Sequence, residues 1–210
     1  MLSPALTDFI KSGLCCDYPT VWLFVVRTLA NGHPVSPTSV ASALKMPLDD
    51  VQVALASFTD IEYDNTGDIV ACGLSLLPTP HCFKVNGNAL YTWCALDALM
   101  YPVALCQVAQ VESHCPVTGT AVRLTVTPTG VSHLSPAGAV LSMVTPAMQV
   151  RCCNARNSFC SHVHFISSAQ AAESWLSIHP DATILSVEEA WQVGYAIVQR
   201  RLAGDRLGTG

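Results

Sequence analysis

A cysteine and an aspartate, Cys94 and Asp97, stand three residues apart in the otherwise apolar segment 91–102. Positions i and i+3 share a face of a helix, so a thiol that can lose a proton would lie beside a carboxylate that can accept one. The segment holds no Lys or Arg to neutralise Asp97, although a buried carboxylate needs a partner. The two residues alone favour a plainer interpretation, a buried cysteine next to an aspartate that is hydrogen-bonded to backbone.

A second cysteine, Cys160, lies close to two histidines, His162 and His164. If residues 160–166 form a strand, the alternation of side chains places all three on one face. Together with the first cysteine and its aspartate, such a row could form a Cys-His-Asp zinc site. For the two histidines we prefer the plainer interpretation, in which they are hydrogen-bonded or partly exposed strand residues. Cys160 is kept as a candidate ligand of a soft metal.

The chain has 10 cysteines, and none of them forms a C-x-x-C pair, which argues against zinc ribbons, zinc fingers and thioredoxin-type redox motifs. The N-terminus lacks the basic and apolar regions of an export signal, so we expect a cytoplasmic protein with reduced thiols. The longest apolar run, residues 21–26, is too short to span a membrane. The pairs Cys15-Cys16 and Cys152-Cys153 could be accessory thiols, but an incidental origin is favoured, and Cys115 is interpreted as structural.

A large hydrophobic core must hold these candidate residues in place. The composition predicts such a core, because 50% of the 210 residues are hydrophobic and only 12% are charged. Residues 1–80 predict three helices and a hairpin. The helices cover residues 19–30, a short stretch capped by Ser36, and residues 47–58, and the hairpin turns at residues 64–67. Three helices and a wing-like hairpin indicate a winged helix-turn-helix.

The charge of residues 1–80 argues against DNA binding by this winged-helix-like region. It contains three basic and eight acidic residues, a net charge of −5, whereas residues 81–210 are neutral. Lys45 is the only basic residue in the candidate recognition helices. Nucleic-acid affinity comes largely from Lys and Arg that neutralise phosphates, so we expect no nucleic-acid partner.

Residues 81–210 predict the catalytic core, which combines short apolar strands with helices. A strand is expected at 81–85, turned by Asn86-Gly87, and is followed by a helix around Cys94 with Thr92 as its N-cap and Pro102 at its end. The further expected elements are strands at 108–111, 121–126, 139–144 and 160–166, and helices that start near Ser167 and at Ser186. The predicted class is α+β: a helical, winged-helix-like N-terminal part plus a mixed core of short, mainly antiparallel strands with flanking helices.

Motifs along most of residues 20–200 resemble the organomercurial lyases, also called alkylmercury lyases, of bacterial mercury resistance. The two cysteine motifs, taken together with the aspartate between them, are the most specific part of this resemblance. The matching stretches are 61–64, 73–76, 90–99 with 101–102, 113–115 with 118–119, 124–128, 136–138, and 158–160 with 162–165.

The resemblance implies that Cys94, Asp97 and Cys160 are the catalytic residues. It implies protonolysis of the carbon–mercury bond of alkyl- and arylmercury compounds to a hydrocarbon and Hg(II), which the same three residues would hold. Mercury is then substrate and product, no cofactor is needed, and excess external thiol supports turnover. The implied partners are small organomercurials, cellular thiols and a mercuric reductase that receives Hg(II), with no membrane partner. The family has no counterpart for the two adjacent cysteine pairs or for the tail after Leu202.

Two other classes of protein fit some of the same residues. One is a thiol-based metal sensor whose winged-helix region regulates transcription, and DNA binding would distinguish it. The other is a non-catalytic metal-binding protein, such as a copper or zinc chaperone, which would be purified with stoichiometric metal.

Overall fold

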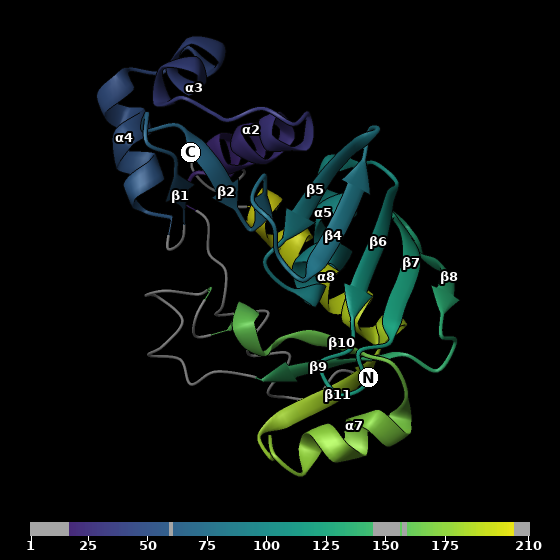
Figure 1. Ribbon diagram of the computed structural model, residues 1–210. Helices are drawn as coiled ribbons and strands as arrows, with labels where there is room; N and C mark the ends of the chain where they lie inside the picture. Colours follow the sequence, from purple (N-terminus) through teal and green to yellow (C-terminus); the bar gives the residue numbers. More distant parts are fainter. Residues whose placement is uncertain (1–16, 59–60, 145–155, 157–158, 204–210) are drawn as a thin grey trace.

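The computed structural model describes residues 17–58, 61–144, 156 and 159–203 (Figure 1). Its N-terminal part consists of α2 (Pro19–Ala30), α3 (Pro37–Leu44), α4 (Leu48–Ala56) and the antiparallel pair β1 (Glu62–Tyr63) and β2 (Ile69–Cys72). The arrangement of three helices and a hairpin predicted from the sequence is therefore present.

Local sequence signals set the ends of these elements. The Ser36 side chain caps α3 by accepting a hydrogen bond from the backbone N–H of Ser39, at 3.1 Å, and Pro37 occupies the first helical position. In the hairpin, a carboxylate oxygen of Asp64 accepts hydrogen bonds from the backbone N–H groups of Thr66 and Asp68 at 2.8 and 3.0 Å. These bonds keep the turn closed.

The hairpin continues into the main antiparallel sheet, whose strand order is β1-β2-β3-β5-β4-β6-β7-β8. Asn86 and Gly87, with φ of 52° and 79°, form the predicted turn between β4 and β5, since a type I′ hairpin needs positive φ at both positions. The strands added here are β3 (Leu74–Ser75), β4 (His81–Val85), β5 (Asn88–Thr92), β6 (Ala109–His114), β7 (Ala121–Thr127) and β8 (Gly130–Ser135).

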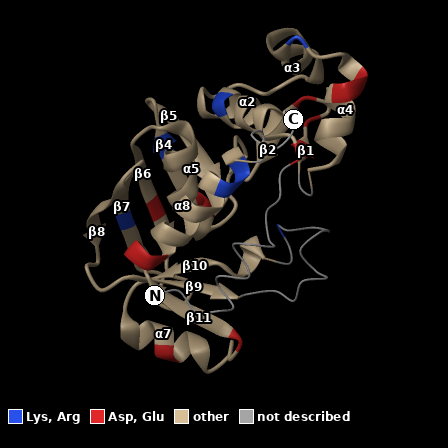
Figure 2. Cartoon of the chain, turned by 180° about the vertical axis from the view of Figure 1, so that it is seen from behind, with Lys and Arg blue, Asp and Glu red and all other residues tan. Residues whose placement is uncertain are grey.

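Two helices, α5 (Ala95–Leu105) and α8 (Val187–Ala203), cover one face of this sheet (Figures 1 and 2). They approach closely at Gly194, where an added Cβ would lie 3.1 Å from the Cβ of Met100. One hydrophobic core passes from α2 through the sheet to these helices. The division of the chain at residue 80 stays a prediction.

A smaller sheet of order β10-β9-β11 lies below the main sheet in Figure 1, with α7 packed on it. Its elements are β9 (Val140–Val144), β10 (His164–Ile166), β11 (Ala182–Ser186) and α7 (Ala169–Leu176), and a short 3₁₀ turn, η2 (Cys160–His162), precedes β10. Every strand pair among the described residues is antiparallel, so the predicted α+β class is confirmed. None of the described helices combines the length and the apolar character that crossing a membrane requires.

The helix around Cys94 begins and ends later than predicted. Thr92 is not its N-cap, because Thr92 is the last residue of β5 and pairs with both His81 and Leu74. Pro102 does not end it either: Pro102 lies inside α5, which continues to Leu105 and is buried on all sides there. Burial of this apolar turn outweighs the backbone hydrogen bond that a proline removes.

Two predictions near the second sheet also need correction. Residues 160–166 are not one strand, since Cys160–His162 form the 3₁₀ turn and the strand starts only at His164. The N-cap of α7 is Ser168 rather than Ser167, and its hydroxyl accepts from the N–H of Ala171 at 3.1 Å. The helix start predicted at Ser186 is confirmed, and Ser186 and Glu189 form a capping box in which each side chain accepts from the backbone N–H of the other residue.

Candidate active site

Cys94 is the N-cap of α5. Its backbone is extended, and its sulfur accepts a hydrogen bond from the backbone N–H of Asp97 at 3.4 Å. This is the place that serine or aspartate usually takes at a helix start, so the cap itself holds the thiol at the helix N-terminus. Cys94 and Asp97 are close together, as expected. Their proximity arises because Cys94 caps the helix, and not because both residues lie on one face inside it.

Cys160 approaches the same point from η2. Its thiol donates to the Oδ2 atom of Asp97 at a sulfur–oxygen distance of 3.8 Å. The two sulfur atoms and a carboxylate oxygen of Asp97 all lie within 4.8 Å of one another. The structure therefore brings together the three residues that the sequence predicted, from segments more than sixty positions apart.

A backbone hydrogen bond connects the two segments that carry the thiols. The N–H of Ala95, the first residue of α5, donates to the carbonyl oxygen of Val163 at 3.2 Å. The first N–H groups of a helix have no partner within the helix, so α5 uses one of them to hold the chain that follows Cys160.

Burial controls the protonation of this site. Burial raises the pKa of the Cys94 thiol well above its usual range, and the Cys160 hydrogen bond and the Asp97 charge add to this effect. The hydrogen bond from the Asp97 N–H at the helix N-terminus lowers this pKa, but desolvation outweighs that single contact. Burial likewise raises the pKa of Asp97 to about 6, although hydrogen bonds from Cys94 and the charge of Arg201 act in the opposite direction. Asp97 is enclosed by protein yet keeps some solvent exposure.

Arg201, in the last turn of α8, supplies the positive charge that the sequence around Asp97 lacks. It lowers the pKa of Asp97, and its guanidinium carbon lies 4.9 Å from the ring centre of Trp22 in α2. Nothing in the sequence near Asp97 indicates this partner, because Arg201 looks only like a charge suited to the C-terminus of its own helix.

Tyr101 closes the same region from the next turn of α5. Its hydroxyl donates to the backbone oxygen of Cys72 at 2.8 Å and its ring stacks on Trp22. A Cβ at Gly73, whose φ is 76°, would lie 2.0 Å from the Tyr101 hydroxyl, so only glycine fits there. These contacts hold the N-terminal part against the helix that carries Asp97.

Trp93 and Arg156 form a second feature that the sequence did not predict. The guanidinium carbon of Arg156 lies 5.4 Å from the ring centre of Trp93, directly before Cys94, and Arg156 also pairs with Glu62. An aromatic ring and a cation thus lie next to the first thiol.

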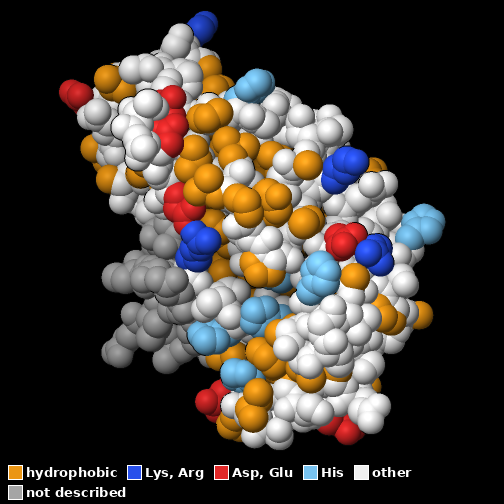
Figure 3. All heavy atoms as spheres, viewed as in Figure 1, with side chains coloured by type: hydrophobic (Ala, Val, Ile, Leu, Met, Phe, Trp, Pro, Cys, Tyr) orange, Lys and Arg blue, Asp and Glu red, His pale blue; other side chains and the backbone are white. Residues whose placement is uncertain are grey.

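The two neighbouring histidines do not join the thiols. His162 is exposed on η2, and the Nε2 atom of His164 is bonded to the carbonyl oxygen of Ser161 at 2.9 Å. Within the described part of the chain, the group of possible metal ligands contains Cys94, Asp97 and Cys160 but neither histidine. Histidine side chains instead gather over the lower part of the molecule in Figure 3. The shared face expected for Cys160 and both histidines is wrong, because the 3₁₀ turn breaks the alternation of a strand.

The other cysteines singled out from the sequence are Cys115 and the two adjacent pairs. Cys115 is buried in a turn closed by its backbone bonds to Gly119 and Thr120. Burial raises the pKa of its thiol, but hydrogen bonds to Thr118 and Ser167 outweigh burial and bring it to about 7. The pairs Cys15-Cys16 and Cys152-Cys153 lie outside the residues that the structure describes.

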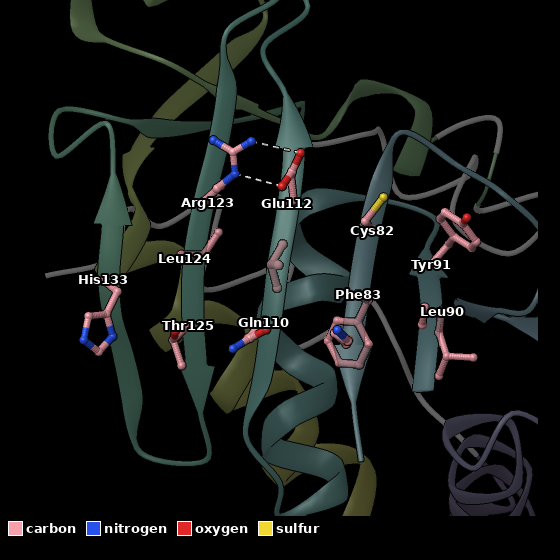
Figure 4. Close-up of a pocket in the computed structure, with 13 residues that line it drawn as sticks. Cys82, Phe83, Leu90, Tyr91, Gln110, Glu112, Arg123, Leu124, Thr125 and His133 are labelled. Atoms are coloured by element: carbon pink, nitrogen blue, oxygen red, sulfur yellow. Dashed lines mark hydrogen bonds and ion pairs between the residues drawn. The ribbon is translucent and has the colours of Figure 1, made fainter. Parts of the chain in front are cut away.

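A separate hollow of about 490 Å³ opens on the outer face of the main sheet, across β4 to β8 (Figure 4). Cys82 and Tyr91 point into it, and Arg123 and Glu112 form an ion pair within it at 2.8 Å. The charges of that pair neutralise each other, and none of the three clustered residues lines the hollow. The thiol cluster is therefore the stronger candidate for the active site.

Comparison with known families agrees with this geometry. A family model described as alkylmercury lyase matches residues 74–199, and a model described as the helix-turn-helix domain of alkylmercury lyase matches residues 2–73. The chain belongs to the alkylmercury lyase family. It is an enzyme of this type, so the family predicted from the sequence is confirmed.

Relatives of this lyase cover nearly its whole length. The alkylmercury lyase of Streptomyces lividans is 43% identical over 95% of this chain and 91% of the relative. That of Staphylococcus epidermidis is 42% identical over 82% and 80%, and that of Pseudomonas putida 38% over 92% and 90%. A crystal structure of the mercury-bound form of MerB2 shares the fold, with a TM-score of 0.80 at 22% identity over 95% of this chain and 100% of that one.

The helix-turn-helix part of the lyase keeps its acidic surface. Figure 2 shows acidic residues on α4 and around β1, and Asp49 and Asp50 occupy the first turn of α4. That this part does not bind DNA stays a prediction from charge.

Proposed function

We propose that this lyase cleaves the carbon–mercury bond of alkyl- and arylmercury compounds by protonolysis, with Cys94 and Cys160 as mercury-binding thiolates and Asp97 as the proton carrier. The observation that supports it is the cluster of two sulfur atoms and one carboxylate oxygen within 4.8 Å. Two metal–sulfur bonds of about 2.3 Å, as for zinc, together span a similar distance. Mercury is a soft metal, and thiolates are its preferred ligands.

The first step is capture of the substrate R–Hg–X, in which X is a labile ligand. The Cys94 sulfur replaces X on mercury, and the Cys94 proton leaves with X as HX. Its raised pKa keeps Cys94 protonated until then, and the strong mercury–sulfur bond supplies the driving force for losing the proton.

The second step uses the bond between Cys160 and Asp97. Asp97 takes the Cys160 proton along the existing S–H···O contact, and the new thiolate adds to mercury. The additional sulfur donates electron density to mercury, so the mercury-bound carbon becomes more basic.

Protonation of that carbon completes cleavage. Asp97 returns its proton to the carbon, the carbon–mercury bond breaks to give R–H, and Hg(II) remains bound by two thiolates with Asp97 beside it. A pKa of about 6 suits both halves of this role, since the group accepts and releases a proton near neutral pH. Two external thiols then remove Hg(II) and reprotonate Cys94 and Cys160.

The same chemistry sets what the enzyme needs from its surroundings. We expect no resident cofactor and a requirement for excess thiol. We also expect a cytoplasmic location, where Cys94 and Cys160 stay reduced. Hg(II) would pass to cellular thiols or to a mercuric reductase. The apolar neighbours Trp93 and Phe159 suit alkyl and aryl groups of the substrate.

The decisive experiment measures benzene release from phenylmercury acetate with excess thiol. Cys94→Ala and Cys160→Ala should each reduce turnover by at least about 10³-fold, because each removes one mercury ligand. Cys82→Ala, which changes a thiol that lines the outer hollow, is the matched control and should keep full activity. If both active-site variants retain the turnover of the parent enzyme, the proposed mechanism is wrong.

A further inference from the structure

The turn that carries Cys160 is held by two hydrogen bonds to backbone carbonyls that follow the thiol in the chain. After it, the Val163 carbonyl accepts from the N–H of Ala95 at 3.2 Å. Directly next to it, the Ser161 carbonyl accepts from the Nε2 atom of His164 at 2.9 Å. The first bond ties the turn to the helix that Cys94 caps, and the second ties it to the first residue of β10.

The His164 ring is well placed for this task because it is itself held. Its backbone pairs with Ser142 in β9, and its ring stacks on His81 at 6.2 Å and meets Trp175 edge-on at 5.3 Å. A carbonyl oxygen can only accept, so the Nε2 atom carries the proton. Burial lowers the pKa of His164, and the nearby His162 and His179 lower it further, which favours the neutral ring with that one tautomer.

We propose that His164 is a positioning residue of the reaction, which holds the Cys160 turn against Cys94 and Asp97 through its hydrogen bond to the Ser161 carbonyl. The inference rests on the proposed function, since it requires Cys160 to be the second thiolate. The side chain of His164 is bonded to this turn, whereas the side chain of the neighbouring His81 is bonded to Ser113.

The distances at the thiols show why this turn must be fixed. The Cys160 sulfur lies 3.8 Å from Asp97 Oδ2, near the long limit for a hydrogen bond from sulfur. A further shift of about 1 Å would break this contact, and displacements of that size cost about 10²-fold when they separate reacting groups. Proton transfer from Cys160 should therefore depend on the turn more strongly than the first capture by Cys94.

The test separates the hydrogen bond from the ring. His164→Phe keeps an aromatic ring between His81 and Trp175 but cannot donate, whereas His164→Gln keeps an amide N–H that reaches the position of Nε2. In benzene release from phenylmercury acetate with excess thiol, we expect His164→Phe to lower kcat about 10-fold, the effect of one lost hydrogen bond, with KM nearly unchanged. His164→Gln should stay within about 3-fold of the parent.

A second pair of variants covers the case in which the phenylalanine variant does not fold. His164→Asn and His164→Gln are equally polar, but the shorter Asn amide does not reach Ser161, so kcat should again differ about 10-fold. His179→Phe, at the other end of the same ring contacts, is the matched control and should behave as the parent.

Two results would overturn the proposal. The first is a His164→Phe variant that keeps the kcat of the parent. The second is a His164→Gln variant that loses as much kcat as His164→Phe or His164→Asn, while thermal unfolding of these variants is unchanged. Cys160→Ala in the same assay separates the two levels of inference. Full turnover without Cys160 would end the proposed function itself, whereas an inactive Cys160→Ala beside a fully active His164→Phe would end only the role of His164.

Discussion

Two neighbouring groups of potential metal ligands in this molecule have opposite uses. The first is the thiol cluster, formed by Cys94, Asp97 and Cys160. The second is the histidine run, formed by His81, His164 and His179, whose rings are connected by direct contact or through Trp175. In the thiol cluster the reactive atoms point at one another within 4.8 Å.

In the histidine run, one ring nitrogen of His81 and one of His164 are bonded to other groups. His81 Nδ1 lies 2.8 Å from the Ser113 hydroxyl, and His164 Nε2 lies 2.9 Å from the Ser161 carbonyl. The rings meet by their faces and edges, as in a packed core. The difference shows that convergence of the donor atoms, and not the types of residue present, separates a reactive site from a structural one.

The largest expected effect tests whether Asp97 acts on the bound substrate. Asp97→Asn keeps the shape of the side chain but cannot carry a proton, so cleavage of phenylmercury should slow by about 10²–10³-fold. Binding should persist because both sulfur atoms remain. Benzene release and mercury retained after gel filtration measure the two properties separately. Unimpaired benzene release would remove Asp97 from the role of the acid.

The two groups should also differ in how they affect stability with pH. The pKa of Asp97 is raised from 3.8 to about 6, so the folded state binds the extra proton between these values. Stability is therefore lost as pH rises through this window. Asp97→Asn should remove the loss and raise the free energy of unfolding at pH 7.5 by about 2 kcal/mol, which urea unfolding at several pH values measures. A variant that is no more stable than the parent at pH 7.5 would contradict this.

His81 predicts a slope of the opposite sign. Burial, with a smaller contribution from His164, lowers the pKa of His81 from 6.5 to about 3, so the unfolded chain binds the extra proton and stability is lost as pH falls below 6.5. His81→Asn can keep the bond to Ser113 and should remove about 2 kcal/mol of the loss between pH 6.5 and 5. The slope is compared, not the absolute stability, because the smaller side chain also leaves a cavity. The exposed His133→Asn is the control, and equal slopes in both variants and the parent would count against a buried neutral His81.

Local signals in the sequence were enough to predict some features of this molecule but not others. The sequence predicted the helices and hairpin of the N-terminal part, because Pro19, Ser36 and the turn after Asp64 are local signals. The residues alone allowed Cys94, Asp97 and Cys160 to share a metal site, but only the resemblance to a family assigned all three to catalysis, since nothing in local spacing joins residue 97 to residue 160.

Elements without a local signal were missed. β8 is largely exposed and shows no alternation, and it is held by pairing with β7. Pro102 gave the wrong end for α5, because burial against α8 and the sheet outweighs a local preference. The pairing of Arg201 with Asp97 also had no local signal, because the packing of α8 in the folded protein places Arg201 near Asp97.

The smallest expected effect concerns this Arg201 charge. Arg201 lowers the pKa of Asp97, so removing the charge should raise that pKa above about 6. Asp97 must be ionised in the free enzyme to accept the Cys160 proton, so the rise of kcat/KM with pH should move to higher pH. Arg201→Met keeps an apolar stem on Trp22 and should lower kcat/KM about 3-fold below pH 6, with little change above pH 8.

Neighbouring variants show whether this effect is electrostatic. Arg201→Lys keeps a charge and should restore most of the parent pH profile, while Arg200→Met removes an exposed charge one position away and should leave it unchanged. An equal loss at every pH would mean that Arg201 acts through packing on Trp22. In that case Asp97 would be tuned by burial and its sulfur partners alone, and the thiol cluster would be electrostatically independent of α8.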